Sequence, residues 1–445
     1  MTNGHVKAAK RDHANTFLRR GVIIMAIRLY GVGMTFLVTI LLTRGLGADG
    51  YGAYAFLFAV VTLAALPTQF GLPDLVVRET TRAAEAGAPG HMRALWRWAH
   101  RFIAVTTLVV IALLLLWQHL SGDDDVQTSI AAYIAFLLIP LIALANLRAA
   151  ILRGLGHDLL GQLPEHAIRP TLFALFLLAM LLLPDLPSSV TGAFAVQVTA
   201  VGLATAIGSF MLWRLAPRAV PIEIERTEKR RWNSAAFFMG TISGLVLINN
   251  SVDIIMLGLW KSNADVGHYR LASMVGALIT LGMQTMNIYA MPHLTHFLAT
   301  GEKDKLARVV RHATQLSFGF SLLALVAILL LGEQMLVMVF GSEFSAAFSI
   351  LLVLASGHVL NAFFGPARVF LMMAGHERLA AFLTGFGTLF NIGLNALLIP
   401  SYGPIGAAMA TVASIVVTKV MSFVVVWHLH GVLIWPLPNY QRLAK

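Results

Sequence analysis

The sequence contains no cysteine and few charged residues. The absence of Cys in all 445 residues excludes disulfides, thiolate metal sites and cysteine nucleophiles, and it leaves the redox compartment undetermined. Only 12% of the residues are charged, whereas 58% are hydrophobic. Because so few charges cannot cover the surface of a soluble protein of this length, the composition indicates a polytopic membrane protein.

Signature motifs of the common enzyme classes are missing as well. The chain has no G-x-x-x-x-G-K-[ST], no H-E-x-x-H and no G-x-S-x-G. One G-x-G-x-x-G occurs at Gly45, Gly47 and Gly50, but nucleotide binding there needs a preceding strand and a following helix. Since the motif falls in a short turn between two apolar runs, we interpret it as a chance match. We therefore predict a protein that is not an enzyme.

Long apolar runs dominate the chain. Twelve of them approach the roughly 20 residues that cross a bilayer. They cover residues 20–43, 51–73, 99–120, 129–152, 166–184, 190–213, 237–260, 266–291, 313–332, 346–373, 379–400 and 402–428. The connections are too short for a separate soluble domain or for the sizeable extracytoplasmic loop of a membrane glycan polymerase or ligase, which is the enzymatic alternative.

Basic residues lie mainly in alternate connections. The opposite connections hold few Lys or Arg and include the acidic run Asp123, Asp124 and Asp125. The positive-inside rule then places both termini in the cytoplasm and requires an even number of spans. The net charge of +11 thus reflects membrane topology, and no nucleic-acid partner is expected.

The two halves of the chain resemble one another. The stretch "YGAYAFLFAVVTLAAL" matches "VGHYRLASMVGALITL" at an offset of 215 residues, which aligns Gly52 with Gly267 and Tyr54 with Tyr269. Each half holds six spans, so both halves enter the membrane in the same direction, as in transporters that rock one bundle against the other. The predicted parts are a cytoplasmic tail (1–19), a six-helix bundle (20–213), a cytoplasmic linker (214–236), a second six-helix bundle (237–428) and a C-terminal tail (429–445).

A few ionisable residues fall inside the apolar runs. A charge there costs roughly 2.5–3.5 kcal/mol on insertion scales and usually faces a cavity or a partner. For Arg28, Asp253 and Lys419 we therefore favour a functional role. Neutral polar residues in other spans, such as Gln284, either line a cavity or form interhelical hydrogen bonds that hold the bundle together.

Several motifs resemble the polysaccharide-transporter branch of the multidrug/oligosaccharidyl-lipid/polysaccharide (MOP) exporter superfamily. They are "NIGLNALLIPSYGPIGAAMATVAS", "FGSEFSAA", "NNSVDIIMLG" and the "YGAY" turn. Relatives flip undecaprenyl-diphosphate-linked oligosaccharides, such as O-antigen or exopolysaccharide repeat units, across the bacterial inner membrane, while other branches export drugs or flip the peptidoglycan precursor. The resemblance implies an all-α fold of 12 transmembrane helices in two six-helix bundles, V-shaped around a central cavity.

The resemblance and the intramembrane charges together predict an alternating-access flippase. Cations at a cavity wall suit a diphosphate, whereas a multidrug exporter of the same fold, the main alternative, should offer an acidic cavity to cationic drugs. The candidate partners are the lipid-linked oligosaccharide, membrane lipids, a polysaccharide polymerase and a chain-length regulator. The candidate substrate-binding residues are Arg28, Lys419, Arg368, Asn249, Asn250, Gln284, His358 and Asn361.

A second candidate site involves a coupling ion. Asn391 and Asn395 share one helix face, and Asp253 and Thr411 lie at a similar predicted depth. This set is similar to the sodium site of lipid II flippases, except that the position of Asn395 is typically acidic there. Three alternatives stay open: a Na⁺ site, protonation of Asp253, or a structural clasp between Asp253 and Asn391. Apart from Na⁺ or H⁺, no cofactor is expected.

Overall fold

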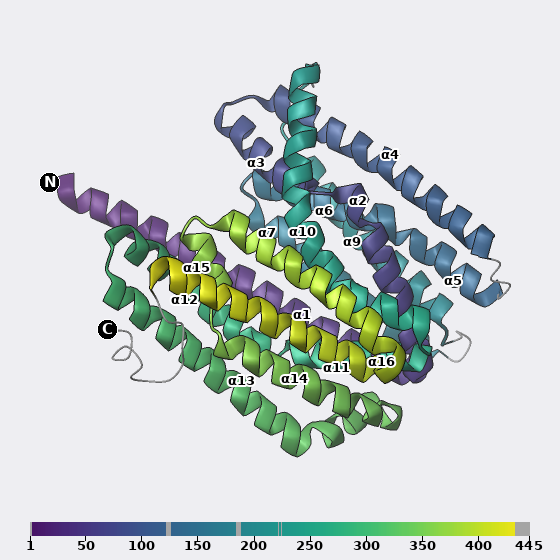
Figure 1. The fold of residues 1–445 in the computed structure, drawn as a ribbon. Helices are drawn as coiled ribbons and strands as arrows, with labels where there is room; N and C mark the ends of the chain where they lie inside the picture. The colour runs from purple at the N-terminus through teal and green to yellow at the C-terminus, as the bar shows by residue number, and fades with distance from the viewer. Residues whose placement is uncertain (1, 122–125, 184–187, 221, 224, 432–445) are drawn as a thin grey trace. The chain divides into compact units, whose positions relative to one another are not determined.

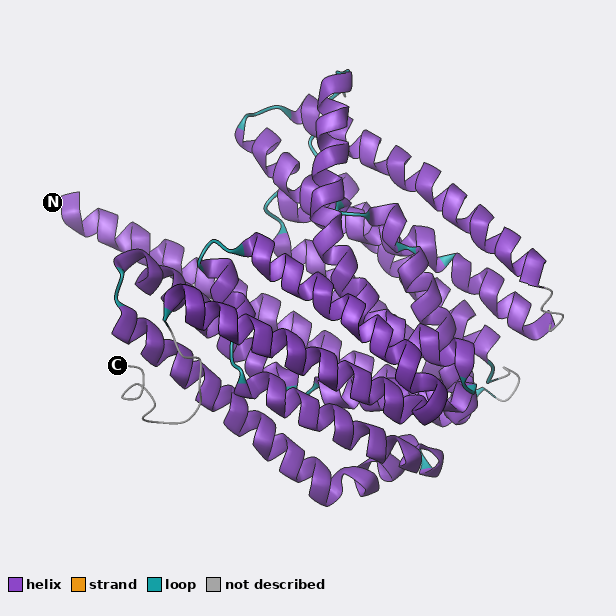
Figure 2. Ribbon diagram, in the orientation of Figure 1, coloured by secondary structure: helices purple, strands orange, loops and turns teal. Residues whose placement is uncertain are grey.

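The computed structural model describes residues 2–121, 126–183, 188–220, 222–223 and 225–431, and every regular element in these ranges is helical (Figure 2). The elements are α1 (Thr2–Ala64), α2 (Leu66–Gln69), α3 (Leu72–Glu85), α4 (Pro89–Ser121), α5 (Val126–Phe136), α6 (Leu138–Gly154), α7 (Asp158–Leu163), η1 (Pro164–Ile168), α8 (Arg169–Leu182), α9 (Val190–Leu215), α10 (Arg226–Trp260), α11 (Asn263–Ala277), α12 (Thr280–Thr300), α13 (Lys303–Phe340), η2 (Ser342–Ala346), α14 (Ala347–Phe363), α15 (Ala367–Met373) and α16 (Glu377–His430).

The predicted spans all fall on helices. Ten helices in the described ranges are long and apolar enough to cross a membrane. Of these, α1 holds the predicted span 20–43 and most of 51–73, and α16 holds 379–400 and 402–428, with a break between the two spans in each helix (Figure 1). The prediction of an all-α polytopic membrane fold with twelve spans is confirmed. The acidic run 123–125 and most of the C-terminal tail lie outside the described residues.

Glycines produce the two breaks. Gly47 has φ 68° and ψ −173°, and Gly403 has φ 57° and ψ −136°, conformations that only glycine adopts without strain. Pro404 follows at the start of the next helical segment, where its missing N–H costs no hydrogen bond. Gly47 also explains the glycine-rich stretch of the first turn. The N–H of Ala48 there donates to Glu343 Oε2 at 2.8 Å, so the glycines serve a turn between two helices.

The chain divides into two compact units. One comprises Met1–Leu46 and Val60–Gly244, and the other comprises Gly47–Ala59 and Leu245–Lys445. The start of α10, which belongs to the predicted linker, thus groups with the first unit, and the first part of the second span groups with the second unit. The boundaries of the predicted six-helix bundles stay a prediction.

The core of the first unit is built around α3, which the sequence analysis left within a connection. Leu72, Leu75 and Val76 on one face of this amphipathic helix are fully buried and join a cluster with residues of α4, α6 and α10. Trp96 Nε1 donates to Thr80 Oγ1 at 3.0 Å. The cluster includes the buried Trp232, which explains why the start of α10 groups with this unit.

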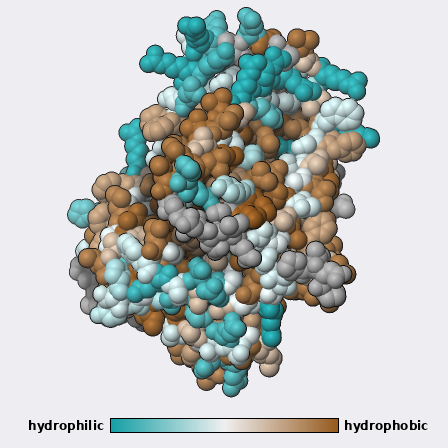
Figure 3. Space-filling model, turned by 90° about the vertical axis from the view of Figure 1, so that its right-hand side faces the viewer, coloured by the Kyte–Doolittle hydropathy of each residue, from teal (hydrophilic) through white to brown (hydrophobic). Residues whose placement is uncertain are grey.

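A second core holds the other unit together. Its buried members come from α12, α13, α15 and α16 and include Leu294, Val310, Phe370, Leu383 and Val426. Many large hydrophobic side chains point outward instead, among them Leu330 and Leu397 at 72% and 71% exposure. On the face drawn in Figure 3, hydrophobic side chains cover much of the middle of the surface. Lipid contact accounts for such exposure on membrane-spanning helices.

The aligned glycines of the internal repeat mark a close helix crossing. A Cβ on Gly52 would lie 1.6 Å from the backbone oxygen of Asn263 and 2.9 Å from the backbone nitrogen of Gly267. We expect Gly52→Ala to lower the free energy of unfolding by about 1–3 kcal/mol, as overpacking does, because α11 must shift. The measurement is the melting midpoint in detergent. Gly393→Ala is the matched control, since nothing lies within 4 Å of its Cβ position; equal midpoints for the two variants would contradict the crossing.

Candidate functional site

The carboxylate of Asp253 lies at the centre of a buried polar cluster. Its Oδ1 accepts from Asn395 Nδ2 at 2.5 Å, and its Oδ2 accepts from Tyr269 Oη at 2.6 Å and Thr411 Oγ1 at 2.8 Å. Asn395 Nδ2 also donates to Asn391 Oδ1 at 3.0 Å. The structure therefore brings together the four residues that the sequence analysis grouped by depth, and it adds Tyr269.

A hydrogen bond links the turn between α10 and α11 to the break in α16, and these two turns fix the relative heights of the residues in this cluster. The turn between α10 and α11 is fixed by a capping box in which Ser262 and Asp265 exchange side-chain and backbone hydrogen bonds. Lys261 Nζ from the same turn donates to Pro400 O at 3.0 Å, beside the break in α16. Residues at similar distances from these turns along antiparallel helices lie at similar heights. Counting from the turn would have found Tyr269, which the sequence analysis used only to align the repeats.

The cluster offers more oxygen atoms than its own hydrogen bonds use. Asp253, Asn391 and Asn395 are 7%, 2% and 0% exposed. Asn395 Oδ1 is buried and has no hydrogen-bond partner among the described residues. Carboxylate, amide and hydroxyl oxygens are the ligands of small hard cations, so the donor set fits a cation such as Na⁺. It also fits a proton, since a carboxylate that gains one can donate to a neighbouring oxygen.

Arg28 lies in the first unit, and its recorded contact is with a neutral side chain. Its Nε donates to Gln162 Oε1 at 2.9 Å, and the side chain is exposed. Among the described residues, no carboxylate forms an ion pair with Arg28. A guanidinium has five N–H donors, so Gln162 orients the group and leaves its remaining donors available to an anion.

Sequence reasoning missed an ion-pair network close to Gln162. Glu165 accepts from Arg148 Nη2 at 2.7 Å and from Arg169 Nη1 at 3.2 Å. Glu165 lies in η1, a π-helical turn, a feature frequent at functional sites. Arg148 is only 3% exposed and also donates to Ala204 O at 3.1 Å. The sequence analysis gave no role to either arginine, because it did not identify Glu165 as the acidic partner that they share.

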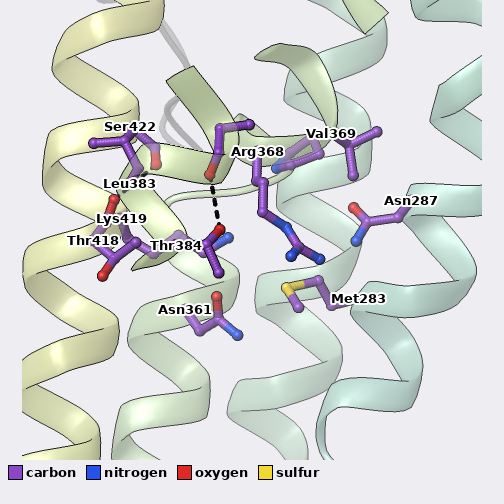
Figure 4. Close-up of a pocket in the computed structure, with 12 residues that line it drawn as sticks. Met283, Asn287, Asn361, Arg368, Val369, Leu383, Thr384, Thr418, Lys419 and Ser422 are labelled. Carbon is purple, nitrogen blue, oxygen red and sulfur yellow. Dashed lines mark hydrogen bonds between the residues drawn. The ribbon is translucent and has the colours of Figure 1, made fainter. Parts of the chain in front are cut away.

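Arg368 and Lys419 line one pocket of the second unit. The pocket measures about 210 Å³, and Figure 4 shows the side chain of Arg368 extending from α15 into it. Lys419 Nζ donates to Gly365 O at 2.9 Å. The lining residues are Met283, Asn287, Asn361, Pro366, Arg368, Val369, Ala380, Leu383, Thr384, Thr418, Lys419 and Ser422. Three predicted substrate-binding residues thus meet here: Arg368, Lys419 and Asn361.

The other predicted substrate-binding residues lie apart from these sites. Asn249 and Asn250 are exposed on α10 and make no recorded hydrogen bond to the Asp253 cluster. Gln284 is exposed and donates to Thr280 Oγ1 one helical turn away. His358 is half-buried with a buried Nδ1 that has no partner among the described residues, and it does not line the pocket. Their assignment to substrate binding stays a prediction.

The ten apolar helices in the described ranges identify a multi-pass membrane protein, and its helices carry a buried carboxylate cluster and cationic side chains. A sequence profile described as "Polysaccharide biosynthesis protein" matches residues 17–297, and one described as "MatE" matches residues 243–397. The first profile covers more than half of the chain, so the chain belongs to the polysaccharide biosynthesis protein family. The predicted resemblance to the MOP superfamily is confirmed.

Curated relatives point the same way. The chain is 23% identical over 409 residues to the probable low-salt glycan biosynthesis flippase of Haloferax volcanii, covering 91% of this chain and 82% of that protein. It is 21% identical over 434 residues to the stage V sporulation protein B of Bacillus subtilis, with the same shares covered. These relatives are named as a flippase and a sporulation protein, and the chain is likewise a membrane flippase or transporter, not an enzyme.

Solved structures share the fold. A multidrug resistance MATE family transporter of the MOP superfamily superposes with a TM-score of 0.73 at 16% identity, covering 91% of this chain and 96% of that one. The lipid II flippase MurJ superposes with a TM-score of 0.71 at 12% identity, covering 91% and 87%. At these identities the likeness is one of fold alone.

Proposed function

We propose that this protein translocates undecaprenyl-diphosphate-linked oligosaccharide repeat units across the bacterial inner membrane for surface polysaccharide synthesis. The proposal depends mainly on Arg28. This cation lies within an apolar span and donates a hydrogen bond to the neutral side chain of Gln162. A diphosphate can accept paired hydrogen bonds from a guanidinium. The glycan flippase among the relatives supports the same substrate class.

The match to the MatE profile makes export of cationic drugs the alternative function. The charged side chains of the two units argue against it. A drug cation needs an acidic group that it can reach. Asp253 is buried and already accepts three hydrogen bonds, and none of the described residues that line the pocket of the second unit is Asp or Glu. Arg28, Arg368 and Lys419 offer positive charge instead.

Transport proceeds by alternating access in this proposal. Arg28 binds the diphosphate while the lipid tail stays in the bilayer. A change of conformation then exposes the bound headgroup to the other side. Both termini face the cytoplasm, in keeping with the positive-inside rule.

Asp253, Asn391, Asn395 and Thr411 couple this cycle to an ion gradient. With Na⁺ the ligands would be the Asp253 carboxylate, the amide oxygens of Asn391 and Asn395 and the Thr411 hydroxyl. With H⁺ the proton would sit on Asp253. A bound cation removes net negative charge from a buried group, which changes the cost of burying it and thereby favours one conformation over another.

Reconstituted vesicles test the substrate assignment. Labelled undecaprenyl-diphosphate oligosaccharide is placed in both leaflets, and a membrane-impermeant glycosidase is added outside. We expect the purified protein to expose the inner-leaflet share to the enzyme, while protein-free vesicles keep that share protected. Export of a cationic dye without exposure of the lipid-linked glycan would replace the proposal with drug transport.

A further inference from the structure

The pocket of the second unit contains a defined set of polar groups around a small volume. Its two cations, Arg368 and Lys419, come from different elements, α15 and α16. Among the described residues, no carboxylate pairs with either cation. Lys419 spends one of its three N–H donors on Gly365 O. Unused positive donors at a concave site favour an anionic ligand.

The neutral polar groups of the pocket suit a sugar better than a bare phosphate. Thr384 and Ser422 donate their hydroxyl protons to Ala380 O and Thr418 O, both at distances of 2.7–2.8 Å. Their oxygens are therefore left as acceptors toward the pocket. A sugar hydroxyl donates to such an acceptor, whereas a fully ionised phosphate has no proton to donate. Asn287 and Asn361, whose side chains form no hydrogen bond to another described residue, add amide groups that both donate and accept.

Size and apolar lining restrict the ligand further. Met283, Val369 and Leu383 contribute apolar surface, against which the C–H face of a sugar ring packs. The cavity volume of about 210 Å³ holds several waters. This volume is sufficient for a single sugar ring.

We infer that the Arg368–Lys419 pocket binds one acidic sugar of the transported glycan, with its carboxylate on the two cations and its hydroxyls on the surrounding amides and hydroxyl oxygens. This inference rests on the proposed flippase function and deepens it, because it makes the repeat unit an anionic glycan. It also separates two anion sites: Arg28 for the diphosphate and the pocket for the sugar acid.

Binding to the purified full-length protein tests the inference. The probe is sodium glucuronate, compared with glucose and with sodium chloride at equal ionic strength, and the readout is the ligand-dependent rise in melting midpoint. We expect glucuronate to stabilise the wild type beyond both comparators. Arg368→Gln and Lys419→Met should each weaken its apparent affinity about tenfold or more, since each removes one charge-assisted hydrogen bond. Arg378→Gln, an exposed position on α16 outside the pocket, should leave the affinity unchanged.

A pyrophosphate arm distinguishes the two anion sites. Pyrophosphate binding should depend on Arg28 and be insensitive to Arg368→Gln and Lys419→Met. If these two variants lose pyrophosphate and Arg28→Gln does not, the pocket binds the diphosphate and the inference is overturned. Glucuronate stabilisation no greater than that of glucose or sodium chloride also overturns it.

A flipping arm separates the inference from the proposed function. In the vesicle assay, a diphosphate-linked glycan with an acidic sugar should flip faster than its neutral counterpart, and Arg368→Gln should abolish that difference. Equal flipping of both glycans contradicts the acidic-sugar assignment while the flippase function stands. Flipping of neither glycan, with glucuronate binding intact in the wild type, contradicts the proposed function and leaves the pocket assigned.

Discussion

Replacing Asp253 by Asn should abolish the response of transport to an imposed ion gradient. The substitution removes the one carboxylate of the cluster but keeps its shape, and the hydroxyls of Tyr269 and Thr411 can rotate to accept from the new amide. The variant should therefore fold. We expect the wild type to flip faster under a sodium or a pH gradient and Asp253→Asn to lose that acceleration. The measurement is flipping in vesicles under each gradient in turn.

A charge-swapped variant makes this test sharper. Asn395 lies within hydrogen-bond distance of Asp253, so Asp253→Asn combined with Asn395→Asp returns one carboxylate to the cluster. Partial recovery of gradient sensitivity is expected, because the charge then lies one hydrogen bond from its original place. Tyr269→Phe removes a donor without removing charge and should keep the response. If the wild type responds to neither gradient and Asp253→Asn remains active, ion coupling is excluded and the cluster has only a structural role.

Reversing the charge of Arg28 should eliminate polysaccharide export. The guanidinium is held by Gln162 and has no acidic partner among the described residues. Arg28→Glu therefore places a carboxylate at the proposed diphosphate site, where like charges repel. Arg28→Lys keeps the charge but loses the planar fork, so it should retain more activity than Arg28→Ala. Polymer production in a deletion strain, with the variants matched for membrane expression, measures the series.

Arg218→Glu supplies the matched control for the charge reversal. It makes the same change of charge at an exposed residue between α9 and α10, outside the spans, and should leave export intact. Gln162→Leu removes the group that orients Arg28 and should cause a smaller loss than Arg28→Ala. Full export by Arg28→Glu would show that the diphosphate binds elsewhere.

Much of the architecture was predictable because the bilayer restricts it. Only helices satisfy all of their backbone groups within a single span, so a hydrophobic run of sufficient length identifies one. This reasoning located every span but missed α3. That helix is amphipathic and lies in a connection, so hydropathy alone could not separate it from a polar loop.

The candidate sites were predictable in part. Asp253, Asn391, Asn395 and Thr411 share a depth that residue counting gives directly, because each helix advances 1.5 Å per residue. Counting residues from the turn between α10 and α11 would also have placed Tyr269 at this depth. The Arg148–Glu165–Arg169 network was not, because Glu165 lies in a π-helical turn whose altered register changes the direction in which each side chain points.

The sequence by itself determined the membrane class, the spans and the internal repeat, since these depend on composition and on periodicities along the chain. Tertiary structure decided which polar side chains meet. Arg368 and Lys419 lie 51 positions apart and line one pocket, whereas Asn249 and Asn250, only a few residues from Asp253, stay outside its cluster. Asn249 and Asn250 lie four and three residues before Asp253, about one helical turn away along α10. Spacing along one helix therefore does not decide which polar side chains meet, and the packing of other helices against it selects the partners.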